Sequence, residues 1–213
     1  MIRPLRVVGL DIASATGRAR THDSLGGPRL AADAIHTNLR PLHDQIDLIE
    51  QFVQRGCGVP EGGGRINPDA RPDLVAVEGT FSRPGGSDYP LHAQRAVPLQ
   101  WLHRRGIPYV EVAPATLKVY ATGSGATSGE NKVTKAQVME AVFATYGELL
   151  AIPRDDNACD ALVLLFMVLD HYGSQVGDLR GELVDVPAVP QSRRRALAAV
   201  KWPELDHLTG GGR

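Results

Sequence analysis

Two short apolar runs, each with an acid near its carboxyl end, limit most strongly what this chain can fold into. The runs are residues 5–12, which contain Asp11, and residues 73–79, which contain Glu78. Apolar runs of this length are typical of buried strands. An acid inside such a strand is costly unless it is paired or bound to a metal. The sequence therefore predicts a buried sheet that carries carboxylates at strand ends.

The rest of the chain alternates further strand patterns with helical ones. Strands are predicted at residues 18–22, 30–36 and 108–112, and helices at 41–54, 87–105, 114–121, 134–146 and 155–172. Residues 14–17 are expected to form a turn, and the Gly- and Pro-rich residues 56–72 an exposed loop. The order of these elements predicts an α/β fold with helices on both faces of the sheet.

Length and composition restrict the class of protein. With 213 residues, of which 43% are apolar and 22% charged, the chain suits one domain with a real core, or one domain with an appendage. Its only cysteines, Cys57 and Cys159, exclude a disulfide scaffold and a zinc site of three or four thiolates. The net charge of −1 argues against a general polyanion binder but leaves room for a local basic surface.

The apolar segments are short. The longest wholly apolar run, residues 161–169, is too short to span a bilayer. The first residues contain an acid within their apolar stretch and no A-x-A-like cleavage site. We therefore expect no signal peptide, no membrane partner and a soluble, reducing compartment.

A third acid completes a set that suggests chemistry. Asp160 lies in the first turns of the helix predicted at residues 155–172, whose surroundings are otherwise apolar. Two strand ends and a helix N-terminus can bring Asp11, Glu78 and Asp160 together at one edge of the sheet. Clustered carboxylates repel, so a divalent cation is their natural neutraliser, and oxygen-only ligands favour Mg²⁺ or Mn²⁺. Two such ions can support phosphodiester hydrolysis.

Each acid also has a purely structural interpretation. Asp11 can form the turn that follows the first strand, and Glu78 can be a solvent-exposed acid at a strand end. Asp155 and Asp156 are both plausible N-caps of the last long helix. The order of the three acids along the chain is more specific than any one of them.

Four segments, taken in order and spacing, resemble the RuvC family of Holliday junction resolvases in the RNase H-like superfamily. They are residues 8–17 (VGLDIASATG), 76–81 (AVEGTF), 113–118 together with 132–142 (KVTKAQVMEAV), and 156–162 (DNACDAL). The resemblance covers roughly residues 5–172. The sequence is therefore identified as a candidate member of that family.

The resemblance implies an RNase H-like mixed sheet flanked by helices on both faces, forming a nuclease domain over residues 1–173. It also implies a homodimer in the cytoplasm that nicks two opposed strands of a four-way DNA junction during recombination, with Mg²⁺ or Mn²⁺, two ions to each site. Asp11, Glu78 and Asp160 match the family's catalytic acids. The residues implied in DNA binding are Phe81, Lys118, Lys132 and Lys135. The structural alternatives are that Phe81 packs a loop and that the lysines are ordinary solvated side chains.

The chain departs from the family pattern at the fourth ligand. The family usually has an acid or a histidine three residues before its last aspartate, where this chain has Asn157. Asp156, four residues before Asp160, shares the same helix face about as well. We predict that Asp156 is the fourth catalytic and metal ligand, with Asn157 as the alternative neutral ligand.

The chain departs from the family in length as well. Residues 56–68 and 126–130 lengthen two loops, and residues 174–213 form a C-terminal extension with a basic helix. Such variation would suit a phage or divergent branch, acting in the host cytoplasm if phage-encoded. Residues Arg193 to Arg195 can bind DNA phosphates through nonspecific electrostatic attraction, or they can form a solvated helix face. The extension can also form a dimer contact through Leu197, Val200 and Trp202.

Other functions compete with junction resolution. A relative that debranches a wider range of DNA, or that processes RNA, would keep the same acids. A sugar-kinase-like fold also opens with a strand and an acid, but it needs two lobes and nearly twice this length. A non-catalytic scaffold is disfavoured by the three acids.

Overall fold

The computed structural model describes residues 5–24, 27–80, 89–126, 129–147, 152–173 and 190–205. Its centre is a five-stranded mixed sheet in the order β3-β2-β1-β4-β5. The strands are β1 (Val7–Asp11), β2 (Ala15–Ser24), β3 (Gly27–His36), β4 (Leu74–Glu78) and β5 (Tyr109–Val112). The first three pair antiparallel, whereas β4 runs parallel to both β1 and β5.

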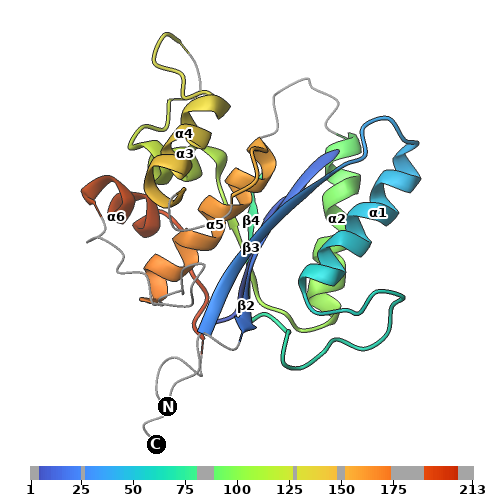
Figure 1. Ribbon diagram of the computed structural model, residues 1–213. Helices are drawn as coiled ribbons and strands as arrows, with labels where there is room; N and C mark the ends of the chain where they lie inside the picture. The colour runs from blue at the N-terminus through green and yellow to red at the C-terminus, as the bar shows by residue number, and fades with distance from the viewer. Residues whose placement is uncertain are drawn as a thin grey trace, which may run out of the picture.

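Helices cover both faces of this sheet (Figure 1). Two lie on one face and share its core: α1 (Leu42–Gly56) and α2 (Tyr89–Arg104). The helices of the other face are α3 (Pro114–Thr122), α4 (Lys135–Tyr146), α5 (Asp156–Tyr172) and α6 (Gln191–Ala198). Of these, α5 lies directly on β1 and β2. The layers agree with the predicted α/β arrangement.

Side-chain alternation along the central strands sets which way the acids point. In β1, Val8 and Leu10 pack into the core beneath α1 and α2, whereas Val7 packs beneath α5. In β4, Val75 and Val77 face the first core, and Leu74 and Ala76 face the second. Because successive side chains alternate across a strand, Asp11 and Glu78 both fall on the α5 face at the carboxyl ends of two parallel neighbours.

The described elements follow the sequence expectations closely, with one informative difference. The strand predicted at residues 18–22 begins at Ala15, because Thr16 and Gly17 pair with Ile35 and Ala34 of β3. The turn predicted at residues 14–17 is therefore shorter. Helix α4 begins after a polar capping residue, because Thr134 forms a capping box with Gln137.

The described part of the C-terminal extension packs on the same core as the sheet. Leu197 is buried there, and Arg193 donates a hydrogen bond to the Tyr146 hydroxyl at 3.3 Å. Trp202 stacks on His171 of α5, with ring centroids 4.6 Å apart. Residues 174–189 lie outside the described residues, so the domain boundary at 173 stays a prediction. None of the helices in the described segments has the length and apolar character needed to cross a membrane.

Candidate metal centre

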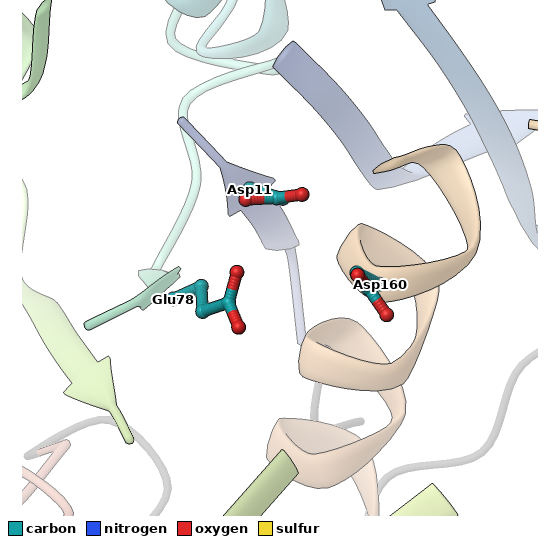
Figure 2. Close-up of side chains that lie close together, drawn as sticks. All are labelled: Asp11, Glu78 and Asp160. Carbon is teal, nitrogen blue, oxygen red and sulfur yellow. The ribbon is translucent and has the colours of Figure 1, made fainter. Parts of the chain in front are cut away.

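Asp11, Glu78 and Asp160 meet at the carboxyl end of the sheet. One carboxylate oxygen from each acid lies within 4.8 Å of the others. Figure 2 shows the three side chains turned toward a common space between the ends of β1 and β4 and the first turns of α5. Asp11 is buried, with 7% of its surface exposed, and the other two are partly exposed. The structure thus brings together the three acids that the sequence pattern singled out.

Two glycines allow α5 to lie close enough for this meeting. A Cβ atom on Gly9 of β1 would come within 2.1 Å of the Ala161 carbonyl oxygen. A Cβ on Gly17 of β2 would come within 1.9 Å of the Asn157 carbonyl oxygen. Real Cβ atoms do not approach so closely, so any larger residue would lift the start of α5 from the sheet. In the sequence these glycines stood out only as part of the family resemblance.

The pKa values of all three acids are raised, so a bound cation would favour their ionised forms. Burial, followed by the charge of Asp11, raises the pKa of Asp160 from 3.8 to about 7. Burial and then the charge of Glu78 raise the pKa of Asp11 well above its ordinary value, and burial raises that of Glu78. These carboxylates therefore resist joint ionisation on their own. An all-oxygen donor set that needs positive charge fits Mg²⁺ or Mn²⁺.

The acids line a cleft of about 310 Å³ that also presents two lysines and an arginine. Lys118 of α3 and Lys135 of α4 line it. Their positive charges counteract part of the burial effect that raises the pKa of Asp160. The protein thus offers anchors for an anionic ligand beside its acidic centre, although its net charge is −1.

The cleft arginine, Arg95, was missed in the sequence. This residue of α2 is 5% exposed, and its guanidinium donates to the backbone carbonyl of Glu78 and pairs with Glu111 of β5 at 3.0 Å. Arg95 therefore fixes the backbone at the end of β4, from which the Glu78 side chain departs. No sequence pattern marks it, because an arginine on a predicted helix is ordinarily a solvated side chain.

The two candidates for the fourth ligand have different surroundings. Asn157 is buried and lines the cleft. Asp156 forms an ion pair with Lys135 and lies outside the group of three acids. Neither is the helix cap: the Asp155 carboxylate accepts a hydrogen bond from the Ala158 amide at 3.0 Å. The identity of the fourth ligand stays a prediction.

Of the remaining predicted DNA-binding residues, only Lys132 lies in the part of the chain that the structure describes. Lys132 is exposed and is not among the residues that line the cleft. Phe81 lies outside the described residues.

Comparisons with known proteins give a consistent pattern, although no protein-family model matches the chain. The chain is 33% identical to the crossover junction endodeoxyribonuclease RuvC of Sorangium cellulosum, over 71% of this chain and 80% of that protein. It is 30% identical to the RuvC of Parafrankia sp., over 89% of this chain and all of that protein. For the RuvC of Gloeobacter violaceus the identity is 35%, but the match spans 53% of this chain and only 61% of the relative.

Solved structures show the same fold. Thermus thermophilus RuvC matches with a TM-score of 0.56 and 20% identity, over 80% of this chain and 98% of that one. The same protein in complex with a Holliday junction substrate matches with a TM-score of 0.55 and 22% identity, over 76% and 90% of the two chains. These matches confirm the predicted RNase H-like mixed sheet flanked by helices on both faces.

Proposed function

Because the chain belongs to the RuvC family of crossover junction endodeoxyribonucleases, we propose that it is a metal-dependent endonuclease that resolves four-way (Holliday) DNA junctions. The observation that carries this proposal is the group of three carboxylates, within 4.8 Å of one another, in a cleft that also holds two lysines. Paired nicks in opposed strands would complete the resolution of a recombination intermediate.

The proposed roles of the acids follow from their placement. Asp11, Glu78 and Asp160 would hold Mg²⁺ or Mn²⁺, and Asn157, which lines the same cleft, offers a neutral oxygen. A pair of such ions would supply an activated water and charge stabilisation for the leaving oxygen of a phosphodiester. The raised pKa values of the acids keep the three from ionising together until positive charge arrives.

The proposed roles of the basic residues are to hold and orient the DNA backbone. Lys118 and Lys135 face the cleft from two helices and would each hold a phosphate by charge and hydrogen bonding. The Arg95 guanidinium donates hydrogen bonds to the Glu78 carbonyl and to the Glu111 carboxylate. Its proposed role is therefore to keep Glu78 in place rather than to bind DNA. Lys132 and Phe81 remain predicted DNA contacts.

We also propose that the active enzyme is a homodimer. Two opposed nicks in a junction with two-fold symmetry require two catalytic sites related by a two-fold axis. Sedimentation of the purified protein should give about twice the chain mass of 22.9 kDa. A single-chain mass that does not change when junction DNA is added would exclude the dimer. A cytoplasmic location is part of the same proposal.

A nuclease assay tests the function directly. Four-way, flap, linear and RNA-containing substrates would be compared with and without Mg²⁺ or Mn²⁺. We expect paired nicks in the four-way junction only when metal is present, and none with the Asp160→Asn variant. Equal cutting of flaps and junctions would indicate a debranching nuclease, and preference for RNA an RNA-processing enzyme. No cutting of any substrate with either metal would refute the proposal.

A further inference from the structure

We propose that Asp156 is a positioning residue for Lys135, which it holds over the three acids, and that it is not itself a metal ligand. The inference deepens the proposed function and rests on it, because Lys135 is useful there only if the cleft receives DNA. It also reverses the role predicted for Asp156 from the sequence. The carboxylate acts through the lysine and does not touch the reacting phosphate.

The first residues of two helices carry this pair. Lys135 is the first residue of α4, and Asp156 is the first residue of α5. The Lys135 ammonium donates to Asp156 Oδ2, while the other carboxylate oxygen, Oδ1, accepts from the Asn157 side-chain amide at 3.3 Å. Both Asp156 oxygens therefore have partners. The ion pair links α4 to the helix that carries Asp160.

Lys135 needs such a partner to stay at the cleft. The lysine side chain is flexible, and 64% of that of Lys135 is exposed, so holding it in one place costs rotamer freedom. Its position at the positive N-terminal end of α4 is also unfavourable for an ammonium. Asp156 lies at the N-terminal end of α5, where a carboxylate is favoured. The ion pair with Asp156 therefore holds the Lys135 ammonium at the cleft, a position that neither its own helix nor its solvent exposure favours.

The position reached in this way suits phosphate capture. Lys135 lines the cleft together with Asp11, Glu78 and Asp160, and its charge acts on Asp11 and Asp160. When a backbone phosphate enters, the ammonium has further N–H donors for it while one stays with Asp156. Lys135 remains protonated throughout, so no proton transfer is involved. Asp156 would then set the direction of the lysine rather than supply a metal oxygen.

A double-mutant cycle separates the two roles. The proteins are wild type, Asp156→Asn, Lys135→Gln and the double variant, each assayed for cutting and for binding of a four-way junction. Asn keeps the size of the side chain, and Asp155 continues to cap the helix. We expect Asp156→Asn to lower kcat/KM about fivefold in wild type but less than about twofold in the Lys135→Gln background, because contacting residues that act as a unit are not additive. Asp156→Glu should restore part of the loss.

A metal titration provides the second measurement. If Asp156 only positions Lys135, Asp156→Asn should change the Mn²⁺ dissociation constant, measured by calorimetry, by less than about tenfold. Loss of a ligand carboxylate would cost more than that, since loss of a mere hydrogen-bond partner of a ligand typically costs about 10–100-fold. Glu140→Gln, which removes an exposed acid from α4 outside the cleft, is the matched control and should leave cutting and Mn²⁺ binding unchanged.

The outcomes distinguish this inference from the proposed function. An equal loss of kcat/KM in both backgrounds, or a Mn²⁺ affinity lowered by about tenfold or more, overturns the role given to Asp156 while junction cutting by wild type stands. If wild type neither cuts nor binds junctions, the proposed function fails, and so does the phosphate-holding role of Lys135. The Mn²⁺ titration then still decides whether Asp156 is a ligand.

Discussion

The carbonyl oxygen of Ala161 in α5 lies so close to Gly9 in β1 that a Cβ atom on this glycine would meet it at 2.1 Å. Asp11, two residues after Gly9, and Asp160, one residue before Ala161, belong to the same acidic centre. The contact between helix and strand backbones therefore fixes the spacing of two carboxylates that are 149 positions apart in the sequence. The candidate metal centre depends on this packing as much as on the acids themselves.

Gly9→Ala should damage both stability and activity. The added methyl group must push α5 away, and overpacking of this kind costs about 1–3 kcal/mol or more. We expect the melting temperature to fall by at least about 4 °C and Mn²⁺ binding to weaken together with junction cutting. Thermal unfolding and calorimetry measure these two effects.

Gly63→Ala is the control for that substitution. A Cβ atom there meets nothing within 4 Å, so its cost is limited to the left-handed backbone of this loop residue, whose φ is +85°, about 1 kcal/mol. It should leave metal binding unchanged. Equal loss of Mn²⁺ affinity in both variants would show that the close approach of α5 does not set the acid spacing.

Asp11→Asn, Glu78→Gln and Asp160→Asn should each abolish detectable cutting and leave four-way junctions bound. Each variant removes one of the three charges that would hold the cation, whereas the lysines that would hold phosphate remain. Activity should drop by at least about a hundredfold, which corresponds to about 2.7 kcal/mol of transition-state stabilisation. Junction binding by gel shift should change little. Wild-type turnover by any one variant would remove that residue from the centre.

The metal-free protein should lose stability as the pH rises from about 4 to 7. The pKa of Asp160 is 3.8 in its ordinary state and about 7 in the fold. Between these values the folded protein keeps a proton that the unfolded chain has released, so the free energy of unfolding falls with rising pH. The raised pKa values of Asp11 and Glu78 act in the same direction.

Melting curves in EDTA across this pH range measure the effect. Asp160→Asn has no proton to lose at this position, so its melting temperature should depend less on pH. Saturating Mn²⁺ should oppose the trend, because ligands bind metal in the ionised form. A metal-free stability that increases from pH 4 to 7 equally in both proteins would show that Asp160 is not buried beside like charge.

Arg95→Met should lower activity about tenfold or more, because it removes the buried guanidinium that donates to the Glu78 carbonyl and to Glu111. A buried acceptor left without its donor costs about 1–3 kcal/mol. Its effect should include a weaker Mn²⁺ affinity, since Glu78 loses its backbone anchor. Glu111→Gln is the matched control: Glu111 is 48% exposed, and loss of such a surface pair costs less than about 1 kcal/mol. If the control weakens Mn²⁺ binding as much as Arg95→Met, the Glu78 contact is not the important one.

Local sequence determined most of the elements and the identity of the three acids. The alternation of residues in 5–12 and 73–79 is a property of the strands themselves, and it fixes on which face Asp11 and Glu78 fall. Capping residues likewise marked the starts of α4 and α5. Order and spacing were sufficient for the family resemblance, which the comparisons confirm.

Only the tertiary structure decided the partners of these residues. Asp155, Asp156 and Asn157 are neighbours in sequence, and each looked able to serve as cap or ligand. Because α4 packs beside α5, Asp156 forms its ion pair with Lys135. Asp155 accepts a hydrogen bond from the α5 backbone and caps the helix, whereas Asn157 lines the cleft. Arg95 acquires its role only because α2 places its guanidinium at the Glu78 carbonyl. Such long-range contacts depend on the relative placement of helices, and local periodicity carries no information about that placement.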